Sequence, residues 1–141
     1  MTREVFFLIG RGGAILFGDA SNSASALPDS RTRWEIIWQH RDELEELTHS
    51  HPNGPLAFSK EDETTMAALE SALGKTLRFS VVAPSGTIVK TGDTVERVDP
   101  EPWWADLLRL CSGMALPAKP PPASIEATAV DETSINSEPS E

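Results

Sequence analysis

The segment HSHPNGPLAFSKED, residues 49–62, contains two histidines and an aspartate with spacing suited to a metal site. His49 and His51 are two apart, so on a β-strand both imidazoles leave the same face. Their Cα atoms would lie roughly 6.5 to 7 Å apart by strand rise, which lets both Nε2 atoms reach one ion. With the carboxylate of Asp62 they supply three ligands of the types that zinc uses and leave one position open, as catalytic zinc sites do. The segment therefore predicts a zinc site suited to hydrolysis.

Ser59 and Asp62 also have a purely structural interpretation. S-x-x-D at a helix start is a variant of the capping box, in which the serine hydroxyl accepts from a backbone amide of the first turn. The acidic side chain also suits the positive end of the helix dipole. Capping and chemistry can coexist, because a hydroxyl has one donor proton and two acceptor lone pairs.

A zinc hydrolase needs a general base near the reacting water. Glu45 shares a strand face with His49 but would lie about 13 Å away along the strand. Glu46 points to the opposite face. Glu4 opens the first predicted strand, and neighbouring strands lie about 4.8 Å apart, so Glu4 is the better candidate by geometry. The alternative for Glu4 is a solvated residue near the chain end.

Hydrophobic periodicity predicts the elements that must position these side chains. The predicted order begins with a β-hairpin around GRGG (runs 4–9 and 14–17) and a polar loop (19–30). Next come a helix capped by Ser30 (about Arg31 to Leu44), a strand from Glu46, a helix from Ser59 to about Leu73 that stops at Gly74, and a strand over 77–83. After these six elements, TIVK begins another strand or an extension. This β-β-α-β-α-β order indicates a small layered α/β domain over residues 1–99.

The composition changes after this domain. Residues 100–112 predict a short amphipathic helix, with an apolar face of Trp103, Trp104, Leu107 and Leu108. Residues 113–141 are rich in Pro, Ala, Ser and Glu and predict a disordered acidic tail, since they cannot bury enough apolar surface to offset the entropy of ordering.

Charge and cysteine content narrow the class of protein. The chain has 141 residues and a net charge of -10, which argues against binding to nucleic acid or to anionic membranes. Its single cysteine, Cys111, permits no internal disulfide and favours a reducing, cytoplasmic setting. The N-terminal apolar run is too short for a signal peptide or a membrane span.

The first predicted helix also contains three aromatic side chains, Trp34, Trp38 and His40. Trp34 and Trp38 lie one helical turn apart and are expected in the core, with a substrate platform as the alternative. His40 is expected at the surface or in packing.

The pattern H-S-H-x7-S-x-x-D, from His49 to Asp62, resembles the JAMM motif of the JAB/MPN metalloproteases, E-x(n)-H-[ST]-H-x7-S-x-x-D. Pro52 after the second histidine matches as well. The resemblance covers roughly residues 3 to 95 and is to a minimal prokaryotic type of the family. It implies a cytidine-deaminase-like sandwich and one zinc ion bound by His49, His51 and Asp62.

The resemblance also implies catalytic roles. Glu4 would hold the attacking water, act as general base and pass its proton to the leaving amine, while Ser59 would donate a hydrogen bond to the oxyanion. The implied reaction is hydrolysis of a peptide or isopeptide bond at the C-terminal tail of a ubiquitin-like or sulfur-carrier protein. The chain departs from the family in starting at its first strand and in having only a short loop at 19–30.

Two other functions are compatible with the same fold. One is a non-catalytic binding or scaffold module, which does not require His49, His51 and Asp62 together. The other is a DNA-associated, RadC-like protein. The net charge of -10 disfavours it, because binding to the phosphate backbone needs clustered basic residues. The sequence leaves open the oligomeric state and the role of the tail.

Overall fold

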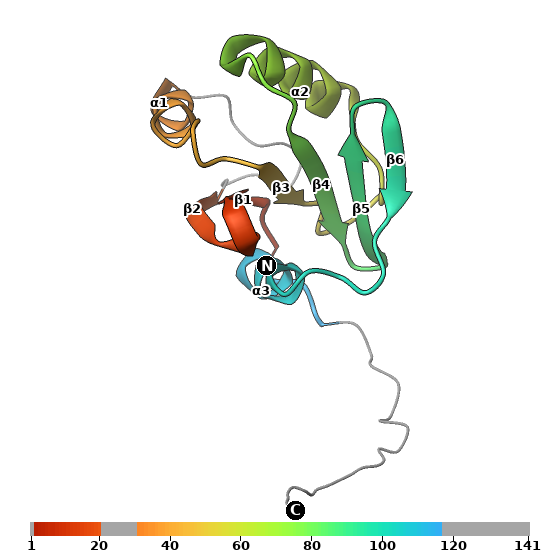
Figure 1. Ribbon diagram of the computed structural model, residues 1–141. Coiled ribbons are helices and arrows are strands. Elements are labelled where there is room, and N and C mark those ends of the chain that lie inside the picture. The colour runs from red at the N-terminus through yellow and green to blue at the C-terminus, as the bar shows by residue number, and fades with distance from the viewer. Residues whose placement is uncertain (1, 21–30, 117–141) are drawn as a thin grey trace, which may run out of the picture.

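The computed structural model describes residues 2–20 and 31–116, which form one mixed six-stranded sheet and three α-helices (Figure 1). The strands are β1 (Val5–Ile9), β2 (Ile15–Ala20), β3 (Glu46–Ser50), β4 (Arg78–Ala83), β5 (Gly86–Thr91) and β6 (Thr94–Arg97). The helices are α1 (Arg31–Gln39), α2 (Lys60–Leu73) and α3 (Trp104–Ser112), and a 3-10 turn, η1, spans Arg11–Gly13. The sheet order is β2-β1-β3-β4-β5-β6, with β3 and β4 parallel and the other pairs antiparallel.

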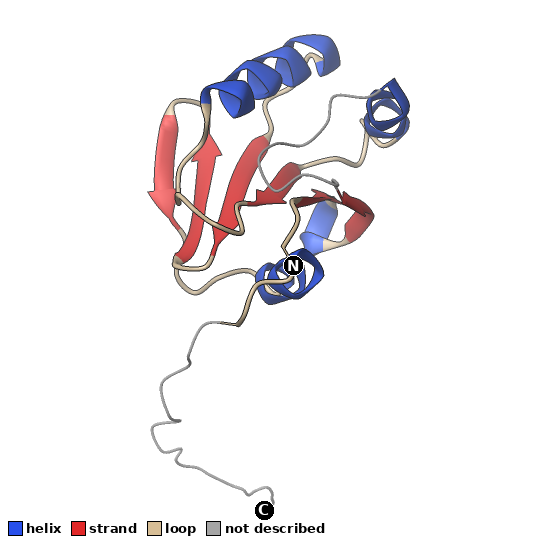
Figure 2. Ribbon diagram, turned by 180° about the vertical axis from the view of Figure 1, so that it is seen from behind, coloured by secondary structure: helices blue, strands red, loops and turns tan. Residues whose placement is uncertain are grey.

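Helices cover the sheet on both faces. Figures 1 and 2 show α1 and α2 on one side and α3 on the other. The run VFFLI of β1 divides between these layers: Phe6 and Leu8 join the core cluster under α1 and α2, while Val5, Phe7 and Ile9 pack with α3. An unbroken apolar strand is expected where both faces are buried. The predicted mixed α/β architecture is therefore confirmed at the level of layers.

The hairpin and the second helix form as predicted. β1 pairs with β2 in antiparallel register around the Gly-rich turn. Ser59 is the N-cap of α2, and Gly74 ends the helix in the left-handed region, with φ of 64°. Only glycine adopts that conformation at little cost, so the stop after Leu73 follows directly from residue type.

The first helix ends earlier than predicted. It stops at Gln39 rather than near Leu44, because the chain then turns: the Leu44 amide donates to the His40 carbonyl. The turn places Leu44 fully inside the core. Two backbone carbonyl groups of this turn, those of Arg41 and Leu44, accept hydrogen bonds from the ammonium group of Lys75. Long-range capping and burial here outweigh the helical periodicity.

Two strand predictions also need correction. β2 continues to Ala20, so Asp19 and Ala20 belong to the sheet and not to the loop predicted over 19–30. The remainder of that loop, including the predicted cap Ser30, lies outside the described residues.

β6 was not predicted, because all four of its residues are exposed and it has no apolar alternation. The Gly92-Asp93 turn before it is the local signal for this hairpin.

The C-terminal helix packs against the sheet with only half of the predicted apolar face. Trp104 and Leu108 are buried against β1, but Trp103 is 62% exposed and Leu107 also faces outward. α3 instead buries Arg109 completely, because Glu101, Asp106 and the Ala83 carbonyl accept its hydrogen bonds. Of the predicted tail, only residues 113–116 are described, and Met114 among them is buried.

Candidate metal centre

The site lies where the C-terminal end of β3 meets the N-terminal end of α2. Leu47 of β3 faces the α1 and α2 layer, and alternation along the strand turns His49 the same way. His51 follows directly after the strand, and its amide still pairs with the Val82 carbonyl of β4 at 2.9 Å. Asp62 stands in the first turn of α2, so the helix start brings its carboxylate back over the two imidazoles.

The three side chains have the spacing of a metal-binding group. His49 Nε2 lies 3.1 Å from His51 Nε2 and 3.2 Å from Asp62 Oδ1, and His51 Nε2 lies 3.3 Å from Asp62 Oδ2. Zinc bonded to four ligands at about 2.0 to 2.1 Å separates neighbouring ligand atoms in a regular tetrahedron by about 3.3 Å. One ligand atom from each residue lies within 4.8 Å of the others, so the three can hold one metal ion.

A hydrogen bond outside the cluster sets the tautomer of His51. Its Nδ1 lies 3.0 Å from the Pro55 carbonyl oxygen, which can only accept. Nδ1 therefore carries the proton, and in the neutral ring Nε2 keeps its lone pair directed at the site. Metal-ligating histidines usually have such an outer partner, which orients the ring.

The charges and hydrogen bonds of the cluster keep the Asp62 side chain ionised, which is the state that binds a metal ion. Burial by itself would raise the Asp62 pKa, but hydrogen bonds from His49 and His51 hold this pKa well below its ordinary value. Burial would likewise lower the His51 pKa, yet the hydrogen bonds to Asp62 and Pro55 and the nearby negative charges raise it. In the metal-free protein His51 is thus stabilised in its charged form, and a metal ion must compete with that proton.

Ser59 combines the two interpretations drawn from its sequence position. The Asp62 amide donates to Ser59 Oγ at 3.0 Å, and the Ser59 amide donates to Asp62 Oδ2 at 2.8 Å, which completes a capping box. The second bond also orients a metal-binding carboxylate. The hydroxyl acts in the box only as an acceptor, so its proton is available to a group in front of the helix.

Glu4 lies near this group, directly before β1, and its carboxyl group interacts electrostatically with His51 and Asp62. β1 and β3 pair with Phe6 opposite His49, and two further steps along the same register bring Glu4 opposite His51. The side chain is 3% exposed. Burial raises the pKa of Glu4 from 4.5 to about 7; the charge of His51 opposes this shift and that of Asp62 adds to it. The expectation of a solvated Glu4 therefore does not hold.

A scan against models of protein families found no match, and neither did a search among curated proteins. No helix formed by residues 2–20 and 31–116 is long and apolar enough to cross a membrane.

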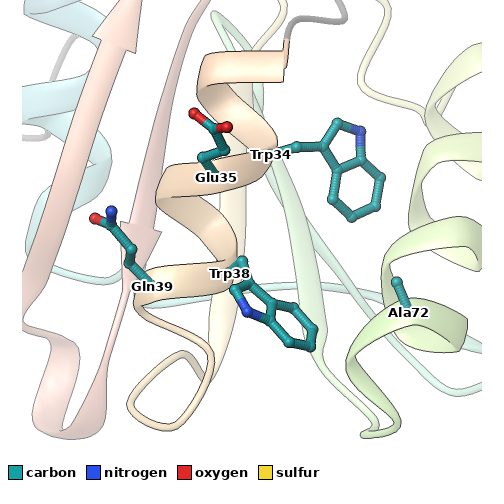
Figure 3. Close-up of a pocket in the computed structure, with 5 residues that line it drawn as sticks. All are labelled: Trp34, Glu35, Trp38, Gln39 and Ala72. Carbon is teal, nitrogen blue, oxygen red and sulfur yellow. The ribbon is translucent and has the colours of Figure 1, made fainter.

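A second concave surface lies away from the metal-binding group. Figure 3 shows Trp34 and Trp38 projecting from α1 toward Ala72 of α2, and they line a cavity of about 440 Å³. Trp38 is 49% exposed, with the guanidinium of Arg41 4.1 Å above its ring, so the predicted core position of Trp38 is wrong.

No sequence pattern predicted a role for Ser50 and Ser112, two buried residues near the site. Ser50 lies between the two histidines and points to the opposite face, as strand alternation requires. Its hydroxyl accepts from the Val5 amide at 2.9 Å and lies 2.7 Å from the Ser112 hydroxyl. The only local signal is the position of Ser50 within H-S-H, since Ser112 is distant in sequence.

Proposed function

We propose that this chain is a zinc-dependent metallopeptidase of the JAB/MPN kind. The observation that carries the proposal is the approach of His49, His51 and Asp62 to spacings near those of a tetrahedral zinc site. A bound zinc ion would supply Lewis acidity to a carbonyl and lower the pKa of water toward neutrality. The open fourth position expected for three protein ligands suits catalysis better than a structural role.

Glu4 and Ser59 supply the remaining chemistry. A carboxyl group with a pKa of about 7 can take a proton from water and later return it to a leaving amine at neutral pH. The Ser59 hydroxyl keeps its proton, so it can donate to the oxyanion that forms during attack on a carbonyl. The burial of Glu4 and the first-turn position of Ser59 are consistent with these two roles.

The substrate class in this proposal comes from the family resemblance. The bond cleaved would be a peptide or isopeptide bond at the C-terminal tail of a ubiquitin-like or sulfur-carrier protein. The net charge of -10 supports a protein substrate over nucleic acid or an anionic membrane surface. The lone cysteine supports a cytoplasmic setting.

Zinc analysis of matched histidine variants tests the site. We expect the wild type to retain about one zinc ion per chain after dialysis and His51→Ala to lose it. His40→Ala is the control, because the His40 imidazole pairs with Glu43 in the turn after α1 and does not belong to the metal-binding group. Equal zinc content in wild type and His51→Ala would refute the site.

Hydrolysis of fusions to ubiquitin-like proteins, joined through peptide or isopeptide bonds, tests the activity. Glu4→Gln should retain zinc and lose about 10²- to 10⁴-fold in kcat, the range for removal of a general acid-base group. Zinc binding without hydrolysis by the wild type would favour the non-catalytic binding module. Unchanged turnover in Glu4→Gln would remove Glu4 as the base.

A further inference from the structure

The backbone before Glu4 is attached to the end of α3. The Arg3 amide donates to the Ser112 carbonyl at 3.0 Å, and Arg3 Nε donates to the Cys111 carbonyl at 3.0 Å. The last carbonyls of a helix have no partner within the helix, and cationic side chains commonly satisfy them. Figures 1 and 2 both show α3 beside β1. A contact between two distant parts of the chain therefore holds the residue before Glu4.

The backbone after Glu4 is held by a chain of buried hydrogen bonds. The Val5 amide donates to Ser50 Oγ at 2.9 Å, and Ser112 Oγ lies 2.7 Å from both Ser50 Oγ and the Leu108 carbonyl. The Leu108 carbonyl can only accept, so Ser112 uses its single proton there and Ser50 donates to Ser112. The order is Val5 amide, Ser50 hydroxyl, Ser112 hydroxyl, Leu108 carbonyl. Both serines are fully buried.

The Glu4 carboxyl group has no comparable support of its own. Within residues 2–20 and 31–116, no group donates a hydrogen bond to it, although the side chain is almost fully buried. Its position relative to His51 therefore depends on the backbone of Arg3 and Val5. Strand alternation places the hydrogen-bond chain and the metal-binding group on opposite faces of the sheet. Ser50 faces α3, whereas His49 faces α2.

We propose that Ser50 and Ser112 are positioning residues, which hold Glu4 against the metal-binding side chains through the backbone of Val5. Through them, the end of α3 sets the placement of the general base although it contributes no group to the site itself. This inference rests on the proposed function for its catalytic consequence. The hydrogen-bond chain can be tested without that function.

The variants are Ser50→Ala, Ser112→Ala and Ser50→Thr, and Ser80→Ala is the matched control. Ser80 is a buried serine on the adjacent strand, and its hydroxyl donates to Glu46 at 2.6 Å, on the same sheet face as Ser50. In the metal-free full-length protein we expect the Val5 amide to exchange about tenfold faster in Ser50→Ala and Ser112→Ala than in wild type. Ser80→Ala should leave this rate unchanged.

Placement of Glu4 is read from its carboxyl ¹³C chemical shift. Zinc should shift this signal in wild type, and the response should fall by about half or more in the two alanine variants, while zinc content stays equal. Where turnover is measurable, kcat should fall about tenfold to a hundredfold with KM unchanged, and Ser50→Thr should restore it because it keeps the hydroxyl.

The outcomes separate this inference from the proposed function. Unaltered Val5 exchange in both alanine variants overturns the inference, whether or not the protein binds zinc. Faster exchange with an unaltered Glu4 response to zinc also overturns it, since the serines would then be merely structural. A wild type that binds no zinc refutes the proposed function, and Val5 exchange then decides the hydrogen-bond chain alone.

Discussion

Ser59 and Asp62 exchange two hydrogen bonds at the start of α2: the Ser59 amide donates to Asp62 Oδ2 at 2.8 Å, and the Asp62 amide donates to Ser59 Oγ at 3.0 Å. The same pair that begins the helix orients one of the three metal-binding groups. The N-cap of α2 and the orientation of this candidate metal ligand are therefore coupled, and a change at Ser59 must be assessed for both.

Variants of Ser59 can separate capping from chemistry. Ser59→Ala should cost about 0.5 to 2 kcal/mol of stability, whereas Ser59→Gly should cost only a few tenths, because glycine is a tolerable N-cap. Both remove the hydroxyl donor, so both should lower kcat by about 10²-fold or more. Thermal unfolding and turnover measured on the same samples check this. A loss of kcat that follows stability across the two variants would contradict a chemical role for the hydroxyl.

The metal-free protein should become less stable as pH rises through neutrality because of Glu4. The pKa of the Glu4 carboxyl group rises from its ordinary value of 4.5 to about 7 in the folded protein, so the folded protein binds this proton more tightly than the unfolded chain does. The contribution to stability is fully present below pH 4.5 and is lost as pH rises through about 7, by about 3 kcal/mol. Glu4→Gln lacks this loss.

Denaturant unfolding with a chelator at pH 5 and pH 8 measures the effect. Wild type should lose stability relative to Glu4→Gln between these two pH values. Parallel changes in both proteins would mean that Glu4 ionises as it does in the unfolded chain.

The ion pair of the buried Arg109 with Glu101 should make the protein less stable as pH falls, which is the opposite of the effect expected from Glu4. The hydrogen bonds of Arg109 are the main cause that lowers the pKa of Glu101, so this contribution is present above pH 4.5 and is lost as pH falls through the lowered value. Arg109→Met removes the donors from Glu101, whose side chain is 27% exposed, and from the Ala83 carbonyl, and should cost about 1 to 3 kcal/mol.

Thermal unfolding across acidic pH checks the role of Glu101. Glu101→Gln should be less stable than wild type at pH 7 and should lose less on acidification. Glu96→Gln, at an exposed position of β6, is the control and should follow wild type. Equal acid sensitivity in wild type and Glu101→Gln would show that the pair with Arg109 does not affect folding.

Local sequence patterns determined much of the fold and the identity of the metal-binding group. The glycine after Leu73, the S-x-x-D cap and the period-two spacing of His49 and His51 each specify a backbone conformation over a few residues, so they could be interpreted without tertiary information. The apolar run at residues 4–9 likewise indicated a strand, and the structure shows that both faces of this strand are buried.

Only the tertiary structure decided the features that depend on which segments meet. α1 ends at Gln39 because Leu44 enters the core and Lys75 caps the turn, and Trp38 is exposed because α1 lies at the border of the helical layer. The register of β1 against β3 placed Glu4 opposite His51, and α3 anchors the residues on both sides of it. Strand order and register are set by the burial of both sheet faces together, a free energy summed over residues distant in sequence, which no local pattern contains.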